Sequence, residues 1–137
     1  MDTLAASPAL FLTGGGNVGL GTTAPRATLD VAGTMVGKPA VAVAASTVDF
    51  ATGNTQFTTA NCGAFALNNL KDGGAYTFVV KGVTATTCAF TAFTDAGSTP
   101  LTVHLPPGHG ATTAGKHTMY NFQIVGADLY AAWIPNY

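Results

Sequence analysis

The chain has 137 residues, which is enough for one domain or for a short stalk followed by a compact head. Charged residues make up only 8% of it, against roughly 25% in average soluble proteins, and the net charge is −1. This balance excludes a basic footprint for nucleic acid or for an anionic membrane, and no apolar run approaches the roughly 20 residues of a membrane span. Every acidic residue is Asp, while Thr and Gly are abundant, so we expect a β-rich chain with almost no helix.

The first residues do not form a secretion signal. Met1-Asp2-Thr3 is not basic, and Ser7 with Pro8 interrupts the apolar run that follows. A complete gene product with this start would not use the general secretion route. The more economical interpretation is that Met1 begins a fragment of a longer protein, and a natural start is the alternative.

A glycine-punctuated segment follows, with the sequence GNVGLGTTAPRATLDVAG over residues 16–33. Glycines spaced this closely suit a backbone that turns often or passes near another backbone. The segment has too few apolar residues to close a core, so we expect it to need partner chains. The alternatives are a flexible Gly-rich linker and a dinucleotide-binding loop, but the Thr22–Pro25 stretch cannot open the helix that such a loop requires. The candidate partner-facing residues are Val18, Leu20, Leu29, Val31 and Met35.

This segment resembles the shaft motif of bacteriophage tail fibres and related bacterial surface fibres, in which GN(V/I)GIGT(T/S)xPxxxLDVxGT is usual. Leu20 stands where Ile is usual. The resemblance implies a parallel homotrimer that carries a C-terminal recognition domain. We therefore predict a short intertwined trimeric β shaft over residues 1–38 and a tip domain over residues 39–137.

The rest of the chain reads as short strands divided by turn signals. The clearest strand is Tyr76–Val80, which follows an Asp-Gly-Gly turn, and a hairpin joins Met119–Val125 to Leu129–Ile134. Strands this short and regular predict an antiparallel β-sandwich rather than a parallel sheet. The further strands are expected at residues 47–50, 56–58, 62–67, 87–93 and 101–103.

The order of these strands, with KDGGAYTFVVKG and a final FQIVGADLYAAWI hairpin, resembles the compact C-terminal heads of tail-fibre-like proteins. The resemblance implies an extracellular adhesin on a phage tail fibre or bacterial surface fibre, which recognises a glycan or other envelope receptor. The polar loops at residues 68–74, 94–100 and 106–116 are the expected contact regions. The individual receptor-binding candidates are Asp95, His109, Lys116, Trp133 and Tyr137.

Cys62 and Cys88 lie in similar contexts, each shortly before a Phe. In an extracellular fibre they are expected to form a disulfide, and two buried free thiols are the alternative. Trp133 and Tyr130 lie on opposite faces of one expected strand, so at most one of them faces the core. Packing in the core or at a trimer interface is the alternative to ligand contact for both.

Catalysis is not expected. The three serines lack a nucleophile-elbow context, and Asp72, Asp95 and Asp128 lie beside turn glycines, where Asp is favoured for local hydrogen bonding. No cofactor is expected. Three histidines cluster near the last loop, at positions 104, 109 and 117, but their spacing does not predict a metal site, and polar loop residues are the better interpretation. The rival function is a purely structural one, in which the tip domain caps and registers the trimer.

Overall fold

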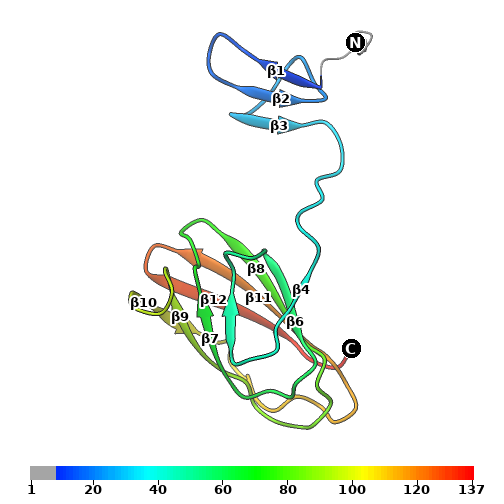
Figure 1. Ribbon diagram of the computed structural model, residues 1–137, viewed down its shortest axis with the longest axis vertical. Coiled ribbons are helices and arrows are strands. Elements are labelled where there is room, and N and C mark those ends of the chain that lie inside the picture. The colour runs from blue at the N-terminus through cyan, green and yellow to red at the C-terminus, as the bar shows by residue number, and fades with distance from the viewer. Residues whose placement is uncertain (1–8) are drawn as a thin grey trace. The chain divides into compact units, whose positions relative to one another are not determined.

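The computed structural model describes residues 9–137, and every regular element among them is a β-strand (Figure 1). The expectation of an all-β chain with almost no helix is confirmed. Residues 9–137 form no helix that is long and apolar enough to span a membrane. The chain divides into two compact units, Met1–Val36 and Gly37–Tyr137. The boundary predicted from the sequence lies two residues further along, and the interpretation of Met1 falls outside the described residues.

The first unit contains a three-stranded sheet in the order β1 (Leu10–Leu12), β2 (Val18–Leu20) and β3 (Leu29–Val31). β1 pairs with β2 antiparallel, and β2 pairs with β3 in parallel. Gly19 permits the close return of the chain after β2, because a Cβ at this position would collide with the carbonyl oxygen of Thr22.

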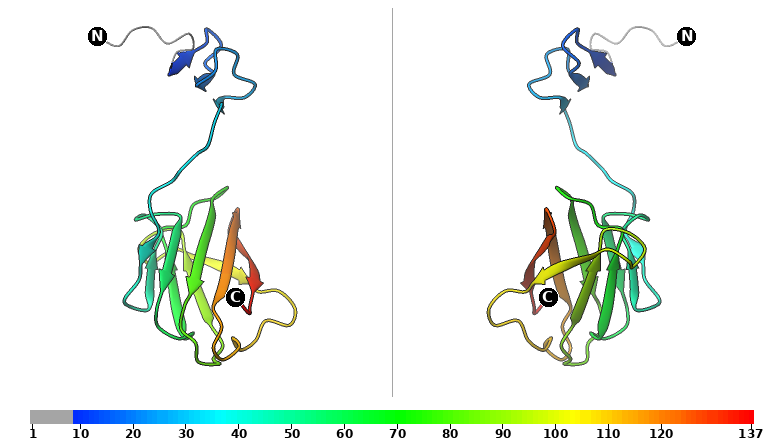
Figure 2. Two further views of the ribbon diagram at one scale, coloured as in Figure 1. Left: turned by 90° about the vertical axis from the view of Figure 1, so that its right-hand side faces the viewer. Right: turned by 90° about the vertical axis from the view of Figure 1, so that its left-hand side faces the viewer.

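The second unit is one continuous nine-stranded sheet in the order β4-β6-β8-β11-β12-β10-β9-β7-β5. Its strands are β4 (Val41–Ala42), β5 (Thr47–Asp49), β6 (Thr55–Thr58), β7 (Ala64–Asn68), β8 (Ala75–Val80), β9 (Ala89–Phe93), β10 (Pro100–His104), β11 (Thr118–Val125) and β12 (Asp128–Ile134). From β4 to β9 the chain alternates between the two arms of this sheet. Each new strand pairs in parallel with the one two places before it (Figure 2).

This winding is that of a short β-solenoid of about four turns, so the predicted architecture of an intertwined β shaft followed by an antiparallel β-sandwich is wrong. We call the arm formed by β4, β6, β8, β11 and β12 the first layer, and the arm formed by β5, β7 and β9 the second layer. β10 joins the two layers, because it pairs antiparallel with β9 and parallel with β12. Besides the β9–β10 pair, antiparallel pairing in this unit is confined to β11, which pairs with β8 and forms the predicted hairpin with β12.

The core of the solenoid lies between the two layers. Phe65 of the second layer meets Phe78 of the first edge to face at 5.0 Å, and Phe90 meets Tyr120 in the same way at 4.8 Å. Alternate residues of each strand point inward, so β8 buries Tyr76, Phe78 and Val80 and presents the residues between them to the outside. The other inward side chains that are almost fully buried include Val48, Leu67, Leu70, Phe122, Ile124 and Leu129.

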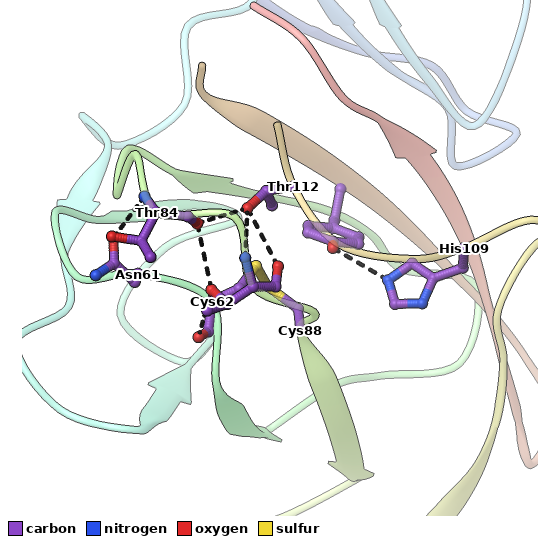
Figure 3. Close-up of a disulfide and its surroundings, with 8 residues drawn as sticks. Asn61, Cys62, Thr84, Cys88, His109 and Thr112 are labelled. Atoms are coloured by element: carbon purple, nitrogen blue, oxygen red, sulfur yellow. Dashed lines mark hydrogen bonds between the residues drawn. A yellow bond between two sulfur atoms is a disulfide. The ribbon is translucent and has the colours of Figure 1, made fainter. Parts of the chain in front are cut away.

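The predicted disulfide is present and joins two successive turns of the solenoid (Figure 3). Cys62 precedes β7, Cys88 precedes β9, and their Cα atoms lie 4.5 Å apart. Hydrogen bonds tie the same corners together, since the Asn61 side chain accepts from the Thr84 amide at 3.0 Å and the Thr86 hydroxyl donates to the Cys62 carbonyl at 3.0 Å. In the chain-entropy description a loop of this size contributes about 3 kcal/mol to stability.

Candidate functional site

One face of the first unit's sheet carries all of its aliphatic strand residues. The strand registers place Leu10, Leu20 and Val31 in one row and Leu12, Val18 and Leu29 in the next, on the same face. Leu10, Leu12 and Leu29 are each more than half exposed. Phe11, Gly19 and Asp30 lie on the opposite face. Residues 9–36 leave this apolar face uncovered, which is unusual for a small soluble sheet.

The sequence-based shaft candidates are therefore brought together in four of five cases. Val18, Leu20, Leu29 and Val31 belong to the apolar face. Met35 follows β3, outside the sheet, and is 75% exposed. Leu10 and Leu12 also belong to this face and were not predicted, although their strict alternation around Phe11 would have placed them there.

Opposite the apolar face, Arg26 and Asp30 form a bidentate ion pair. The Arg26 Nε and Nη2 atoms donate to the two Asp30 carboxylate oxygens at 2.8 and 3.1 Å, and the Arg26 amide donates to Oδ2 at 2.9 Å. These hydrogen bonds lower the pKa of Asp30 from 3.8 to about 2. The LDV motif thus supplies two aliphatic side chains on the apolar face and one carboxylate that fixes the loop before β3.

In the second unit, the sequence-based receptor candidates lie at opposite ends of the strands. The loops at residues 69–74 and 94–99 meet at one of these ends. There the Asn69 amide donates to the Asp95 carbonyl at 2.9 Å, and Lys71 Nζ donates to the Thr94 carbonyl at 2.7 Å. The loop at residues 106–117 lies at the other end, where it bonds to residues 83–87 beside the disulfide. The three predicted contact loops therefore do not form one surface.

Asp95 uses its carboxylate within its own loop. Oδ1 accepts from the amides of Gly97, Ser98 and Thr99 at 3.0, 2.8 and 3.1 Å, and Oδ2 accepts from the hydroxyls of Ser98 and Thr99 at 3.1 and 2.7 Å. Led by the Ser98 amide, these bonds lower the pKa of the carboxyl well below its usual range. This geometry gives Asp95 a structural part in the turn.

His109 and Trp133 face inward rather than toward a ligand. His109 Nε2 lies 3.1 Å from the Tyr120 hydroxyl (Figure 3). The His109 ring also meets Trp133 edge to face at 5.2 Å. Burial lowers the pKa of His109 and raises that of Tyr120 to about 12. Trp133 packs against the core, and its indole Nε1 is buried without a partner among residues 9–137.

Lys116 and Tyr137 stay at the surface near the same loop. The Lys116 amide closes a turn onto the Thr113 carbonyl at 3.1 Å. The Tyr137 backbone exchanges two hydrogen bonds with His117, while its side chain is 59% exposed. Of the five receptor candidates, these two present exposed side chains that the fold does not otherwise use.

An open groove lies elsewhere, on the outer face of the first layer. Its volume is about 520 Å³, and β6, β8, β11 and β12 form its floor. The strand registers set Thr55, Thr77, Asn121 and Ala132 in one outward row, and Ala75, Gln123 and Tyr130 in the next. Asn54 completes the lining and donates to the Ala75 carbonyl at 3.0 Å.

Tyr130 stands at the β12 side of this groove and is half exposed. The His104 ring of β10 stacks on it at 4.8 Å with an angle of 13° between the planes. His104 is itself held by Asp128, whose Oδ1 lies 2.7 Å from Nε2. Tyr130 and Trp133 lie on opposite faces of one strand, as predicted from the sequence. The predicted ligand candidate was Trp133, however, whereas Tyr130 is the outward residue.

The histidines do not gather into a metal site. His104 pairs with Asp128, His109 with Tyr120, and His117 contributes its backbone to the pairing with Tyr137. Within residues 9–137 no group of three or more His, Cys, Asp or Glu side chains is placed to hold a metal ion. Comparison with protein-family models, with curated proteins and with solved structures finds no match to this chain.

Proposed function

We propose that the chain is the tip of a homotrimeric extracellular fibre, on a phage tail or a bacterial surface, and that it binds a glycan on a bacterial envelope. In this proposal the first unit assembles three chains and the solenoid carries the receptor contact. The role is adhesion rather than catalysis. The resemblance of residues 16–33 to fibre shafts motivates the proposal.

The observation that carries the proposal is the uncovered apolar face of the first sheet. Six aliphatic side chains point to one side of a sheet of only nine strand residues, and the described part of this unit, residues 9–36, supplies no second layer to cover them. Burial of such a face is favourable by roughly 25 cal/mol per Å². Three copies around an axis cover one another and leave the Arg26–Asp30 pair on the outside.

Light scattering tests the assembly. The full chain is expected at a mass near three times 13.7 kDa. A monomer at micromolar concentration would contradict the fibre interpretation.

Retention on immobilised envelope polysaccharides tests the adhesin part. The trimer is expected to be retained. A stable trimer that is retained by no surface glycan would instead support the structural role, in which the solenoid caps the fibre.

A further inference from the structure

We propose that the groove between Tyr130 and Asn54 on the outer face of the first layer is the receptor site, and that its ligand is a neutral sugar chain. This inference rests on the proposed function, because it names the site and the ligand class of the adhesin. It replaces the loop residues favoured by the sequence analysis.

The Tyr130 ring forms an aromatic wall on the β12 side of the groove. The strand order is β11-β12-β10, so Tyr130 has His104 of β10 on one side and Gln123 of β11 on the other. His104 stacks on one side of the ring, and the rest of the groove lining lies on β6, β8 and β11. The free side of Tyr130 therefore faces the groove, where an aromatic ring can stack on the apolar face of a pyranose.

The Tyr130 ring is held in place before any ligand binds. Asp128 fixes His104 at 2.7 Å, and His104 limits the rotation of the Tyr130 ring, since the two planes are nearly parallel. A ring held in place before binding loses less conformational freedom when the ligand arrives. His104 and Asp128 are thus positioning residues behind the contact.

The floor of the groove offers side-chain amides that can form hydrogen bonds with a ligand. The Thr77 hydroxyl donates to Asn121 Oδ1 at 2.9 Å, which orients the Asn121 amide and leaves its two N–H donors available. Gln123 is exposed on the same strand. Amides offer donors and acceptors together, as sugar hydroxyls do, and these amides project from strands rather than from flexible loops.

The absence of charged side chains from the groove lining favours a neutral ligand. The residues that line the groove include no Lys, Arg, Asp or Glu. An acidic sugar or a phosphate would find no cation to pair with its charge, whereas a neutral pyranose requires none. The volume of about 520 Å³ lies within the range of roughly 300–1,000 Å³ that is typical of ligand sites.

The experiment measures binding of the full-length trimer to a printed array. One half of the array carries neutral oligosaccharides of glucose, galactose, mannose, rhamnose and N-acetylhexosamines, and the other half carries uronate-, sialate- and phosphate-containing counterparts. Binding is expected on the neutral half. Tyr130→Ala and Asn121→Ala are each expected to weaken it roughly tenfold or more.

Three variants serve as references. Tyr130→Phe keeps the stacking ring and is expected to retain most of the binding. Val125→Ala changes an exposed side chain of β11 outside the groove and is expected to bind as the unaltered chain does. Tyr137→Ala removes an exposed tyrosine outside the groove, at the end of the strands that carries the loop at residues 106–117. Circular dichroism and particle mass establish that each variant is folded and trimeric.

An oligosaccharide that binds on the array is also expected, when it is added to the protein in solution, to shift the side-chain amide NMR signals of Asn121 and Gln123. Normal binding by folded Tyr130→Ala and Asn121→Ala, or loss of binding only in Tyr137→Ala, would overturn the groove but leave the adhesin function standing. Binding confined to the acidic half would overturn the ligand class. A trimer that binds neither half would contradict the proposed function itself.

Discussion

Asp95 was a receptor candidate because it is a polar loop residue, yet its carboxylate accepts five hydrogen bonds from residues 97–99. We predict that Asp95→Ala loosens the turn between β9 and β10 without altering glycan binding. Hydrogen exchange at the amides of Gly97, Ser98 and Thr99 should accelerate about tenfold or more. Ser98→Ala is the matched control, because it removes only one side-chain bond and should accelerate exchange much less. Lost binding with unchanged exchange would return Asp95 to the receptor site.

Asp30 makes the first unit sensitive to acid. Its pKa is about 2 when paired with Arg26, below its ordinary value of 3.8, so folding favours the ionised carboxylate. The stabilisation is fully present above about pH 4 and is lost as the pH falls through 2. We predict that the trimer melts at a lower temperature at pH 2.5 than at pH 5.

Asp30→Asn isolates this effect from the other carboxylates, since the amide does not titrate. The variant should be less stable than the unaltered chain at pH 5, and the difference between them should shrink at pH 2.5. Thermal unfolding followed by light scattering measures both. A difference that stays constant across this range would show that the ion pair does not control acid stability.

At the scale of elements, the corners of the solenoid depend on close stacking of successive turns. A Cβ at Gly82 would collide with the backbone carbonyl of Ala60, one turn earlier. Backbone cannot move aside as a side chain can, so we predict that Gly82→Ala destabilises the unit by roughly 1–3 kcal/mol. Gly63→Ala is the matched control at the same corner, because nothing lies within 4 Å of its added Cβ. Equal urea midpoints for the two variants would contradict the stacking argument.

The positions of the strands could be predicted from the sequence, but their pairing could not. Alternation in Tyr76–Val80 marks a strand with one buried face, and both an antiparallel sandwich and a two-layered solenoid satisfy that pattern. The distinction depends on where each corner sends the chain. Gly82 against Ala60 and the Cys62–Cys88 bridge are contacts between turns, and the local sequence does not reveal them.

The candidate site was predictable only in part for the same reason. Polar loops suggested a receptor surface, but the loops belong to two ends, and the groove is built from outward residues of strands that are distant in sequence. Asn54, Thr77, Asn121 and Tyr130 come together only through the registers of β6, β8, β11 and β12. Leu129 is fully buried, so alternation along β12 was the one signal that could have marked Tyr130 as outward.

At the scale of the whole molecule, the proposed trimerisation and the proposed sugar binding belong to different units and should therefore be separable. An open groove of this kind would hold a single sugar chain weakly, and three linked grooves would raise the apparent affinity for a dense surface by about 100-fold or more when the geometry permits. The first unit would then contribute to adhesion without touching the receptor. Its apolar face is the part to disrupt, because the groove lies in the other unit.

We predict that the double variant Leu12→Asp/Leu29→Asp, which puts two charges in one row of that face, is a monomer by light scattering. Its retention on immobilised glycan should fall by about 100-fold or more, whereas its affinity for one soluble oligosaccharide, measured per chain, should not change. Thr23→Asp adds a charge in the exposed loop between β2 and β3 and should leave both the mass and the retention as they are. If the monomer also lost its affinity for the soluble oligosaccharide, the site would require more than one chain, and the groove of a single solenoid would not be sufficient.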